Sequence, residues 1–226
     1  AHGLRLTQEE YVAGLPRATW HLDGPLNHAH SVHLLSLSRF ARERITVALT
    51  GEGSDELFAG YPRYRLFLLS RLLHAMPGAA LRPAARLLRR ERPRWARLLE
   101  AAAEDAATAA AINPAFVPVD EAAAFAGASD PESVIAGRRE IFRDAEAQGA
   151  GTMEGLLALD QATYLVSLLQ RMDRMSMAVG LECRVPLLDE GVVAHARALL
   201  IRERIDLRTT KKPVRLVLEP AERLLM

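Results

Sequence analysis

Residues 51–56 gather three acidic residues and two glycines in six positions, Gly51-Glu52-Gly53-Ser54-Asp55-Glu56, directly after the apolar run 45–49 and Thr50. Glycines let backbone N–H groups approach an anion closely, but carboxylates repel an anion unless a cation lies between them. Mg²⁺ held by one or two carboxylates and by substrate phosphates is the usual solution. The segment therefore indicates a phosphate site with a divalent cation. The alternative is a helix that begins at Ser54 or Asp55, with solvated glutamates beside it.

A second charged stretch lies at residues 172–189, which read MDRMSMAVGLECRVPLLD. Asp173, Arg174, Glu182, Arg184 and Asp189 alternate there with methionine and leucine. Buried charges need partners, so this pattern indicates an ion-paired network or the wall of a site. The alternative is an amphipathic helix with two exposed ion pairs.

The elements that must position these residues are mostly helical. Periodicity and capping signals predict a strand at 44–50 and helices at 7–15, 29–42, 63–75, 101–111, 132–147, 153–170, 190–200 and 212–225. The stretch 80–100 is basic and amphipathic but broken by Pro83 and Pro93, and 112–133 is predicted to be loop. A lone strand cannot form a sheet, so either further strands are hidden in ambiguous apolar runs or the partner strands lie outside this chain, and we expect the second.

Composition excludes several classes of protein. Half of the 226 residues are hydrophobic and the net charge is +1, so a core can form without a strong field that attracts nucleic acid. The single cysteine, Cys183, excludes an internal disulfide framework and fits a reducing compartment. No apolar run is long enough for a membrane span, and residues 1–11 have no signal-peptide pattern. We therefore expect a cytoplasmic protein without a membrane partner.

Three segments resemble one family in order and spacing. TGEGSDELFAGYPRY resembles the SGEGxDELFGGYxRY segment of the glutamine-hydrolysing asparagine synthetases, DRMSMAVGLECRVPLLD resembles their DRxSMAxGLExRxPFLD segment, and residues 209–215 resemble their TKxxLR segment. The resemblance covers residues 1–226, although 76–150 is generic. It implies part of the synthetase domain, with an α/β Rossmann-like adenine-nucleotide hydrolase (PP-loop ATPase) fold that is incomplete here and mostly helical.

The resemblance also implies an activity. In this family Mg²⁺ and ATP serve to adenylate the aspartate side chain, and ammonia from glutamine then displaces AMP to give asparagine. A glutaminase domain, in cis or in trans, supplies the ammonia. A homodimer is compatible with this scheme, and a nucleic-acid partner is not expected.

Roles carry over to five residues of the acidic glycine turn. Thr50, where the family usually has serine, would line the nucleotide phosphates together with Gly51 and Gly53. Glu52 matches the position that acts on the ammonia nucleophile, and Asp55 matches a carboxylate that coordinates Mg²⁺. Related β-lactam synthetases carry tyrosine at the position of Glu52, so the glutamate favours amide formation from ammonia.

Other segments of the family are not found between residues 1 and 226. These are an SGGxDS pyrophosphate loop, a Cys-led glutaminase domain and an Arg-x-Lys segment. We therefore expect the isolated fragment to be inactive. Two alternatives remain open: an amidotransferase for another carboxylate in a biosynthetic pathway, and a non-catalytic remnant that acts as a binding module.

Three weaker signals remain. His28, His30 and His33 lie close together, but their spacing does not place all three on one helix face, so pocket lining or surface is preferred to a metal site. Seven arginines between 82 and 97 could form a nucleic-acid patch, but a solvated helical face is preferred. Cys183 is interpreted as a small core residue and not as a nucleophile.

Overall fold

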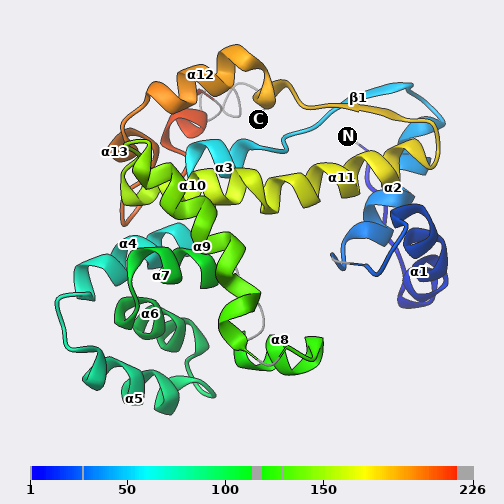
Figure 1. Cartoon of the computed structure of the whole chain (residues 1–226). Coiled ribbons are helices and arrows are strands. Elements are labelled where there is room, and N and C mark those ends of the chain that lie inside the picture. Colours follow the sequence, from blue (N-terminus) through cyan, green and yellow to red (C-terminus); the bar gives the residue numbers. More distant parts are fainter. Residues whose placement is uncertain (1, 27, 114–118, 129, 218–226) are drawn as a thin grey trace. The chain divides into compact units, whose positions relative to one another are not determined.

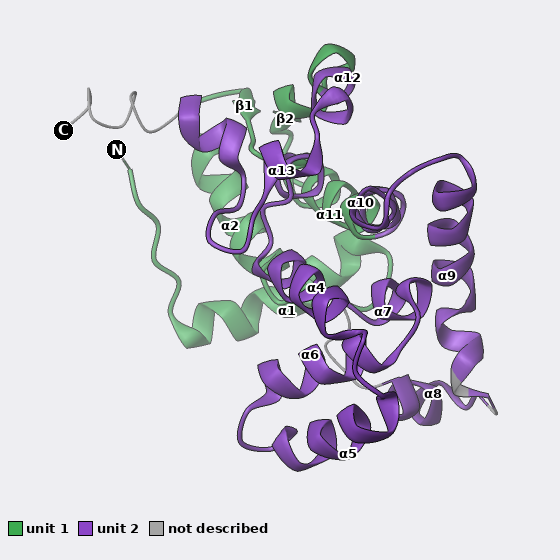
Figure 2. Ribbon diagram, turned by 90° about the vertical axis from the view of Figure 1, so that its left-hand side faces the viewer, with its two compact units in different colours: residues 1–53, 164–192 green, residues 54–163, 193–226 purple. Residues whose placement is uncertain are grey.

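The computed structural model of the chain describes residues 2–26, 28–113, 119–128 and 130–217. The chain forms two compact units, which Figure 2 colours green and purple. The first unit comprises residues 1–53 and 164–192, and the second comprises residues 54–163 and 193–226. The acidic glycine turn therefore crosses from the first unit to the second after Gly53.

The first unit combines three helices with a small sheet. Its elements are α1 (Gln8–Leu22), α2 (Ser31–Arg42), β1 (Val47–Leu49), α11 (Tyr164–Met177), β2 (Glu182–Arg184) and the short 3₁₀ helix Pro186–Leu188. The helices α1, α2 and α11 pack against one another (Figure 1). Their shared core contains Ala18, Leu22, Val32, Leu35 and Met175. This core fixes α11, the helix that carries the polar side chains considered below.

The sheet consists of two parallel strands, with Val47 opposite Glu182 and Leu49 opposite Arg184. The expectation that every partner of the first strand lies outside this chain is therefore wrong. Strand β2 could not be predicted, because its sequence Glu-Cys-Arg shows neither an apolar run nor a clear alternation of apolar and polar residues. Ile45, Val47 and Leu49 are exposed, so this apolar part of the sheet is not covered within the described residues.

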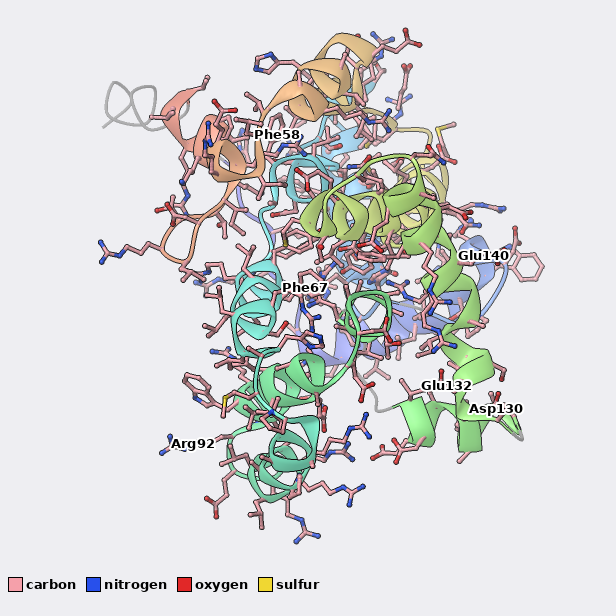
Figure 3. All side chains as sticks on the ribbon, turned by 60° about the vertical axis from the view of Figure 1, so that its left-hand side comes forward. Phe58, Phe67, Arg92, Asp130, Glu132 and Glu140 are labelled. Carbon is pink, nitrogen blue, oxygen red and sulfur yellow. The ribbon has the colours of Figure 1, made fainter. Side chains whose placement is uncertain are left out.

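The second unit consists of helices in its described part. They are α3 (Ser54–Phe58), α4 (Pro62–Leu73), α5 (Gly78–Leu88), α6 (Pro93–Ala103), α7 (Ala106–Ile112), α8 (Val119–Ala126), α9 (Pro131–Ala147), α10 (Thr152–Ala162) and α13 (Ile201–Arg204). The chain enters this unit for the second time within α12 (Glu190–Ala198). Phe58 of α3 and Phe67 of α4, both labelled in Figure 3, are buried. The core that contains Phe67 also includes Tyr64, Phe142, Leu156 and Leu159.

A buried ion pair joins three helices of this unit. Asp160 of α10 is fully buried, and its Oδ2 accepts hydrogen bonds from Arg63 Nη2 at 2.6 Å and from the Tyr64 hydroxyl at 2.8 Å. Arg138 of α9 lies 3.8 Å from the other carboxylate oxygen. Burial disfavours the charge on Arg63, but the Asp160 carboxylate holds the pKa of Arg63 above its ordinary value. Burial and the same carboxylate raise the pKa of Tyr64 well above its ordinary value.

Several predicted helix boundaries differ from the observed ones. α1 continues past Pro16 to Leu22, and Pro83 lies inside α5 instead of breaking it. The predicted helix 153–170 is two helices, because α10 ends at Ala162 and α11 begins at Tyr164. The predicted loop 112–133 contains α8, and residues 114–118 and 129 lie outside the described part. Of the predicted helix 212–225, residues 212–217 are helical and the rest also lies outside.

The coarse expectation of a mostly helical chain with a parallel sheet is confirmed. The predicted helix start at Ser54 or Asp55 is confirmed as well, because α3 begins at Ser54. Among the described residues, no helix combines the length and apolar character that a membrane crossing requires.

Candidate functional site

The turn after β1 meets the segment after β2 because parallel strands end at the same edge of a sheet. The Thr50 N–H donates to the Arg184 carbonyl at 2.9 Å, which continues the pairing of the strands by one residue. Gly53 then adopts a φ of 86°, and a Cβ on it would overlap the side chain of Leu188. Both the backbone conformation and the contact require glycine at this position. The sequence expectation of a tight glycine turn is confirmed by this geometry.

Gly51 and Thr50 differ in what surrounds them. Gly51 is exposed, and a Cβ on it would meet no atom within 4 Å. The Thr50 hydroxyl faces inward, where it lies 3.2 Å from Met172 Sδ and 3.4 Å from the Arg184 carbonyl oxygen. The backbone at Gly51 is therefore accessible to a ligand, whereas the Thr50 hydroxyl is engaged by protein atoms.

Glu52 forms an ion pair with a residue of α11. Arg171 Nη2 donates to Glu52 Oε1 at 3.3 Å, and the two side chains are 11% and 26% exposed. The Arg171 Nε is buried and has no hydrogen-bond partner in the described part of the chain. An arginine held this deeply keeps its counter-charge close, because a buried charge without a partner is costly. The pair thus restricts where the Glu52 carboxylate can lie.

One face of α11 carries several polar contacts of the first unit. Tyr164, Ser167, Arg171 and Arg174 follow one another at spacings of three, four and three residues, so they share one face of the helix. Arg174 forms an ion pair with Asp23, which follows α1. This face therefore contacts both the segment after α1 and the turn after β1.

His28, which precedes α2, packs against the same face of α11. Its Nε2 is 3.3 Å from the Ser167 hydroxyl, and its ring lies edge-on to Tyr164 with 5.7 Å between centroids. Burial, the charge of Arg171 and the charge of His30 lower the pKa of His28 below its ordinary value. His28 is thus a half-buried residue that packs against α11.

The charges of residues 172–189 do not form one joined network. Arg174 pairs with Asp23, and Arg184 pairs with Glu182 two residues away at 2.7 Å. Both pairs are exposed. Asp189 instead accepts the backbone N–H of Gly191 at 2.9 Å. The two exposed ion pairs match the alternative interpretation of this stretch, although it forms a helix end and a strand rather than one helix.

Asp55 lies in α3 of the second unit. Lys211 Nζ contacts its Oδ1 at 2.9 Å, and both side chains are about one third exposed, at 29% for Lys211 and 30% for Asp55. The structure therefore places a cation beside the predicted metal ligand, and this cation is an ammonium group. Glu56, the next acidic residue, is buried and accepts a hydrogen bond from the Tyr61 hydroxyl at 2.6 Å.

The side chains of the candidate site fit a metal ion that is bound together with phosphate groups. Within the described residues, no group of three histidine, cysteine, aspartate or glutamate side chains converges on a metal position. A metal held by protein side chains alone is therefore not supported, including at His28, His30 and His33. A partly exposed Asp55 fits Mg²⁺ that arrives with phosphate groups, because such an ion takes one or two protein carboxylates.

The remaining weak signals have structural explanations. Arg82 and Arg89 form ion pairs with Glu104 and Glu100, at 3.1 and 3.0 Å. Arg92, labelled in Figure 3, lies exposed just before α6. These contacts are those of a solvated helical face. Cys183 lies in β2 and is half-buried.

Two residues of the site carried no assigned role in the sequence analysis. Arg171 lies one residue before the quoted charged stretch and is 119 residues from Glu52. Lys211 lies in a quoted segment, but nothing in its sequence context indicates Asp55 as its partner. The sequence signal that could have indicated Arg171 is its spacing of four residues from Ser167, which places both residues on one face of α11.

The comparisons with known proteins agree with the quoted motifs. The family model of asparagine synthase matches residues 1–222. A putative glutamine-hydrolysing asparagine synthetase of Mycobacterium tuberculosis is 32% identical over 229 residues, which covers 95% of this chain and 33% of the relative. No solved structure matches. The chain therefore belongs to the asparagine synthase family, as its motifs led us to expect.

Shorter stretches of the chain match other proteins. Asparagine synthetase 1 of Bacillus subtilis is 45% identical over 60 residues, which covers 26% of this chain and 10% of the relative. The amidase chyE of Penicillium rubens is 36% identical over 81 residues, or 35% of this chain and 12% of the relative. This chain spans about a third of the mycobacterial relative's length.

Proposed function

We propose that the protein uses ATP to amidate aspartate, and that this chain forms part of its synthetase domain. In this proposal an aspartate carboxylate oxygen attacks the α-phosphorus of ATP and pyrophosphate leaves. Ammonia derived from glutamine then attacks the acyl carbon and AMP leaves. The family membership supports the reaction class, and the ion-paired Glu52 beside an open glycine turn is the observation that carries the assignment.

Glu52 would accept the proton that the attacking nitrogen loses. Its carboxylate is partly exposed, so it can contact a ligand, while Arg171 restricts its orientation. A carboxylate fixed beside developing positive charge lowers the barrier of the attack. Arg171 would thus act through Glu52 as a positioning residue.

The turn would receive the nucleotide phosphates. Thr50, Gly51 and Gly53 lie at the carboxyl end of β1, the edge at which parallel sheets bind their ligands. The exposed backbone of Gly51 allows close approach. Mg²⁺, when bound with the nucleotide, would supply neutralisation of phosphate charge, and Asp55 would be its protein ligand.

The sheet itself supports the proposed PP-loop ATPase fold. Parallel sheets are generally covered on both faces and contain more than two strands. Here Ile45, Val47 and Leu49 are exposed, with Leu49 72% exposed. We infer that further strands and helices of the synthetase domain continue this sheet. A glutaminase domain, in cis or in trans, would supply ammonia.

A second acceptor is the main competing function. The fungal relative chyE is named an amidase and not an asparagine synthetase, and our second candidate is a synthetase-like enzyme that amidates a carboxylate other than aspartate. The residues of the turn would serve either acceptor, because they act on the nucleotide and on ammonia. Acceptor choice would depend on residues other than Thr50, Gly51, Glu52 and Gly53.

The substitution Glu52→Gln tests the assignment in the protein expressed from its complete reading frame. We expect acceptor-dependent pyrophosphate release to persist and amide formation to fall by roughly a hundredfold or more, as for loss of a general base. Asp55→Asn is the comparison variant, and it should weaken use of Mg²⁺ and ATP in the first step. Equal loss of both steps in Glu52→Gln would instead assign Glu52 to the nucleotide.

A further inference from the structure

The hairpin that α5 and α6 form in the second unit concentrates positive charge. Residues 82–97 contain seven arginines and one glutamate, so this stretch has a net charge of +6, whereas the whole sequence has a net charge of +1. Like charges this close together repel one another and oppose folding. The repulsion is relieved by ion pairs within the protein, by solvent and salt, or by an anionic partner.

Ion pairs within the protein engage two of the seven arginines. Arg82 pairs with Glu104, and Arg89 pairs with Glu100. The other five are exposed and form no ion pair or side-chain hydrogen bond with another described residue: Arg86, Arg90, Arg92, Arg94 and Arg97. Figure 3 shows the side chain of Arg92 directed away from the helices. Five positive charges of this hairpin are therefore open to a partner.

The two ion pairs show how the hairpin is arranged. Arg89 lies after Arg82 in the chain, whereas its partner Glu100 lies before Glu104, so α5 and α6 run antiparallel. The two helices also pack against each other along their lengths (Figure 1). The last turn of α5 and the first turn of α6 therefore lie at the same end of the hairpin.

The connection between the two helices has a defined backbone. The Arg92 N–H donates to the Leu88 carbonyl at 2.8 Å, and the Trp95 N–H donates to the Arg92 carbonyl at 3.0 Å. Pro93 is the first residue of α6, where its fixed φ suits the start of a helix. The side chains around this connection are therefore presented from an ordered backbone.

Two large apolar side chains are exposed at the same end of the hairpin. Leu87, in the last turn of α5, is 83% exposed, and Trp95, in the first turn of α6, is 52% exposed. Single exposed apolar side chains are normal on a protein surface, but here two lie among unpaired arginines. We call Leu87, Trp95 and the five unpaired arginines the hairpin tip.

We propose that the hairpin tip binds the surface of an anionic lipid membrane. Guanidinium groups donate hydrogen bonds to lipid phosphates, tryptophan lies at the level of the headgroups, and leucine enters the boundary with the acyl chains. This contact is peripheral, so it does not require the long apolar run of a membrane span. The lack of such a run in the sequence excluded a spanning segment only.

The apolar side chains favour lipid over nucleic acid as the anionic partner. Nucleic-acid phosphates would satisfy the arginines, but Leu87 can neither stack on a base nor form a hydrogen bond with one. At a lipid surface, the burial of Leu87 and Trp95 and the attraction of the arginines act together. An acidic protein would need a surface that matches the turn, whereas lipid headgroups rearrange around it.

Vesicle sedimentation tests the proposal with the protein expressed from its complete reading frame. The probes are vesicles of phosphatidylglycerol and phosphatidylcholine in equal parts, and vesicles of phosphatidylcholine alone. We expect binding to the first kind, binding to the second that is weaker by about tenfold or more, and loss of binding as salt is added. Binding to neither kind of vesicle, or to both kinds equally, would overturn the proposal.

The double substitution Arg90→Gln with Arg92→Gln tests the contribution of charge. Each basic residue near an anionic surface strengthens binding by roughly fivefold, so this variant should bind the anionic vesicles roughly twenty-fivefold more weakly. The control is Arg17→Gln with Arg39→Gln, which removes the same charge from exposed arginines of α1 and α2. The control should stay within about twofold of the unsubstituted protein. Equal weakening in both variants would show that overall charge, and not the hairpin tip, holds the lipid.

The substitution Leu87→Gln tests the apolar contribution. We expect binding to the anionic vesicles to weaken by roughly five- to twentyfold, because the leucine no longer leaves water. Leu72→Gln is the control, since Leu72 of α4 is 67% exposed and lies outside the hairpin tip. Equal binding by Leu87→Gln and the unsubstituted protein would contradict insertion of the tip. A single-stranded RNA oligonucleotide that binds through the same arginines, without binding to vesicles, would overturn the proposal in favour of nucleic acid.

Discussion

At the scale of single residues, the pair Glu52–Arg171 defines the candidate site in the first unit. The resemblance to the family's SGEGxDELFGGYxRY segment implied a role for Glu52. It could not predict Arg171 as the partner, because the two residues are 119 positions apart and no local pattern joins them. A family motif assigns a role to a residue, whereas the orientation of its side chain depends on a tertiary contact.

Arg171→Met should impair the second chemical step more than the first. Loss of the guanidinium frees the Glu52 carboxylate to rotate, and misplacement by about 1 Å can cost roughly a hundredfold in rate. We expect amide formation to fall by roughly ten- to a hundredfold, with pyrophosphate release little changed. The ratio of amide formed to AMP formed, here called the partition, measures this effect.

Arg174→Met is the matched control for this prediction. Arg174 lies three residues further along α11 and pairs with Asp23 in an exposed position. Exposed pairs of this kind contribute about 0–1 kcal/mol, so the partition should stay unchanged. If Arg171→Met and Arg174→Met altered the partition equally, Arg171 would have no specific effect on Glu52.

At the scale of secondary-structure elements, glycine and proline residues indicated the ends of helices more often than they indicated loops. Pro93 and Pro131 each lie in the first turn of a helix, α6 and α9, where the missing N–H costs nothing. Gly127 follows α8 with a φ of 67°. The cluster of such residues in 112–133 suggested a loop, but it surrounds the short helix α8. Strand β2 was missed because its three residues lack apolar periodicity.

The segment that carries Lys211 should loosen in acid. Hydrogen bonds from Lys212 and from the backbone N–H groups of Thr209 and Arg208 lower the pKa of Asp206 from 3.8 to about 2. A depressed carboxyl pKa contributes stability that is present above pH 3.8 and lost as the pH falls through about 2. Carboxyl NMR of Asp206 should show a midpoint near 2. Asp206→Asn should remove the dependence, and a midpoint near 3.8 would contradict these contacts.

The buried carboxylate of Asp160 should contribute strongly to the stability of the second unit. Asp160→Asn keeps the size of the side chain but leaves Arg63 and Arg138 without their shared counter-charge. Breaking a buried pair in this way costs about 3–5 kcal/mol, which urea unfolding can measure. Glu132→Gln removes a partly exposed pair with Arg139 and should cost less than about 1 kcal/mol. Equal midpoints for both variants would show that the buried carboxylate of Asp160 stabilises the fold no more than the Glu132 carboxylate does.

At the scale of the whole molecule, each unit contains its own core and one part of the candidate machinery. The first unit carries the turn with Glu52, and the second carries Asp55 with Lys211. The motifs predicted the family, the mostly helical content and the turn. They could not predict the two-unit division, because it depends on the packing of α11 against α1 and α2 rather than on order along the chain.

We propose that the protein activates a carboxylate as an acyl-adenylate and then amidates it. The most direct measurement uses the protein expressed from its complete reading frame, with ATP, Mg²⁺, ammonia and aspartate. We expect AMP, pyrophosphate and asparagine in equal amounts, all dependent on the acceptor. Formation of ADP and phosphate instead of AMP and pyrophosphate would contradict the claim. Equal products with another carboxylate and none with aspartate would keep the mechanism and replace the acceptor.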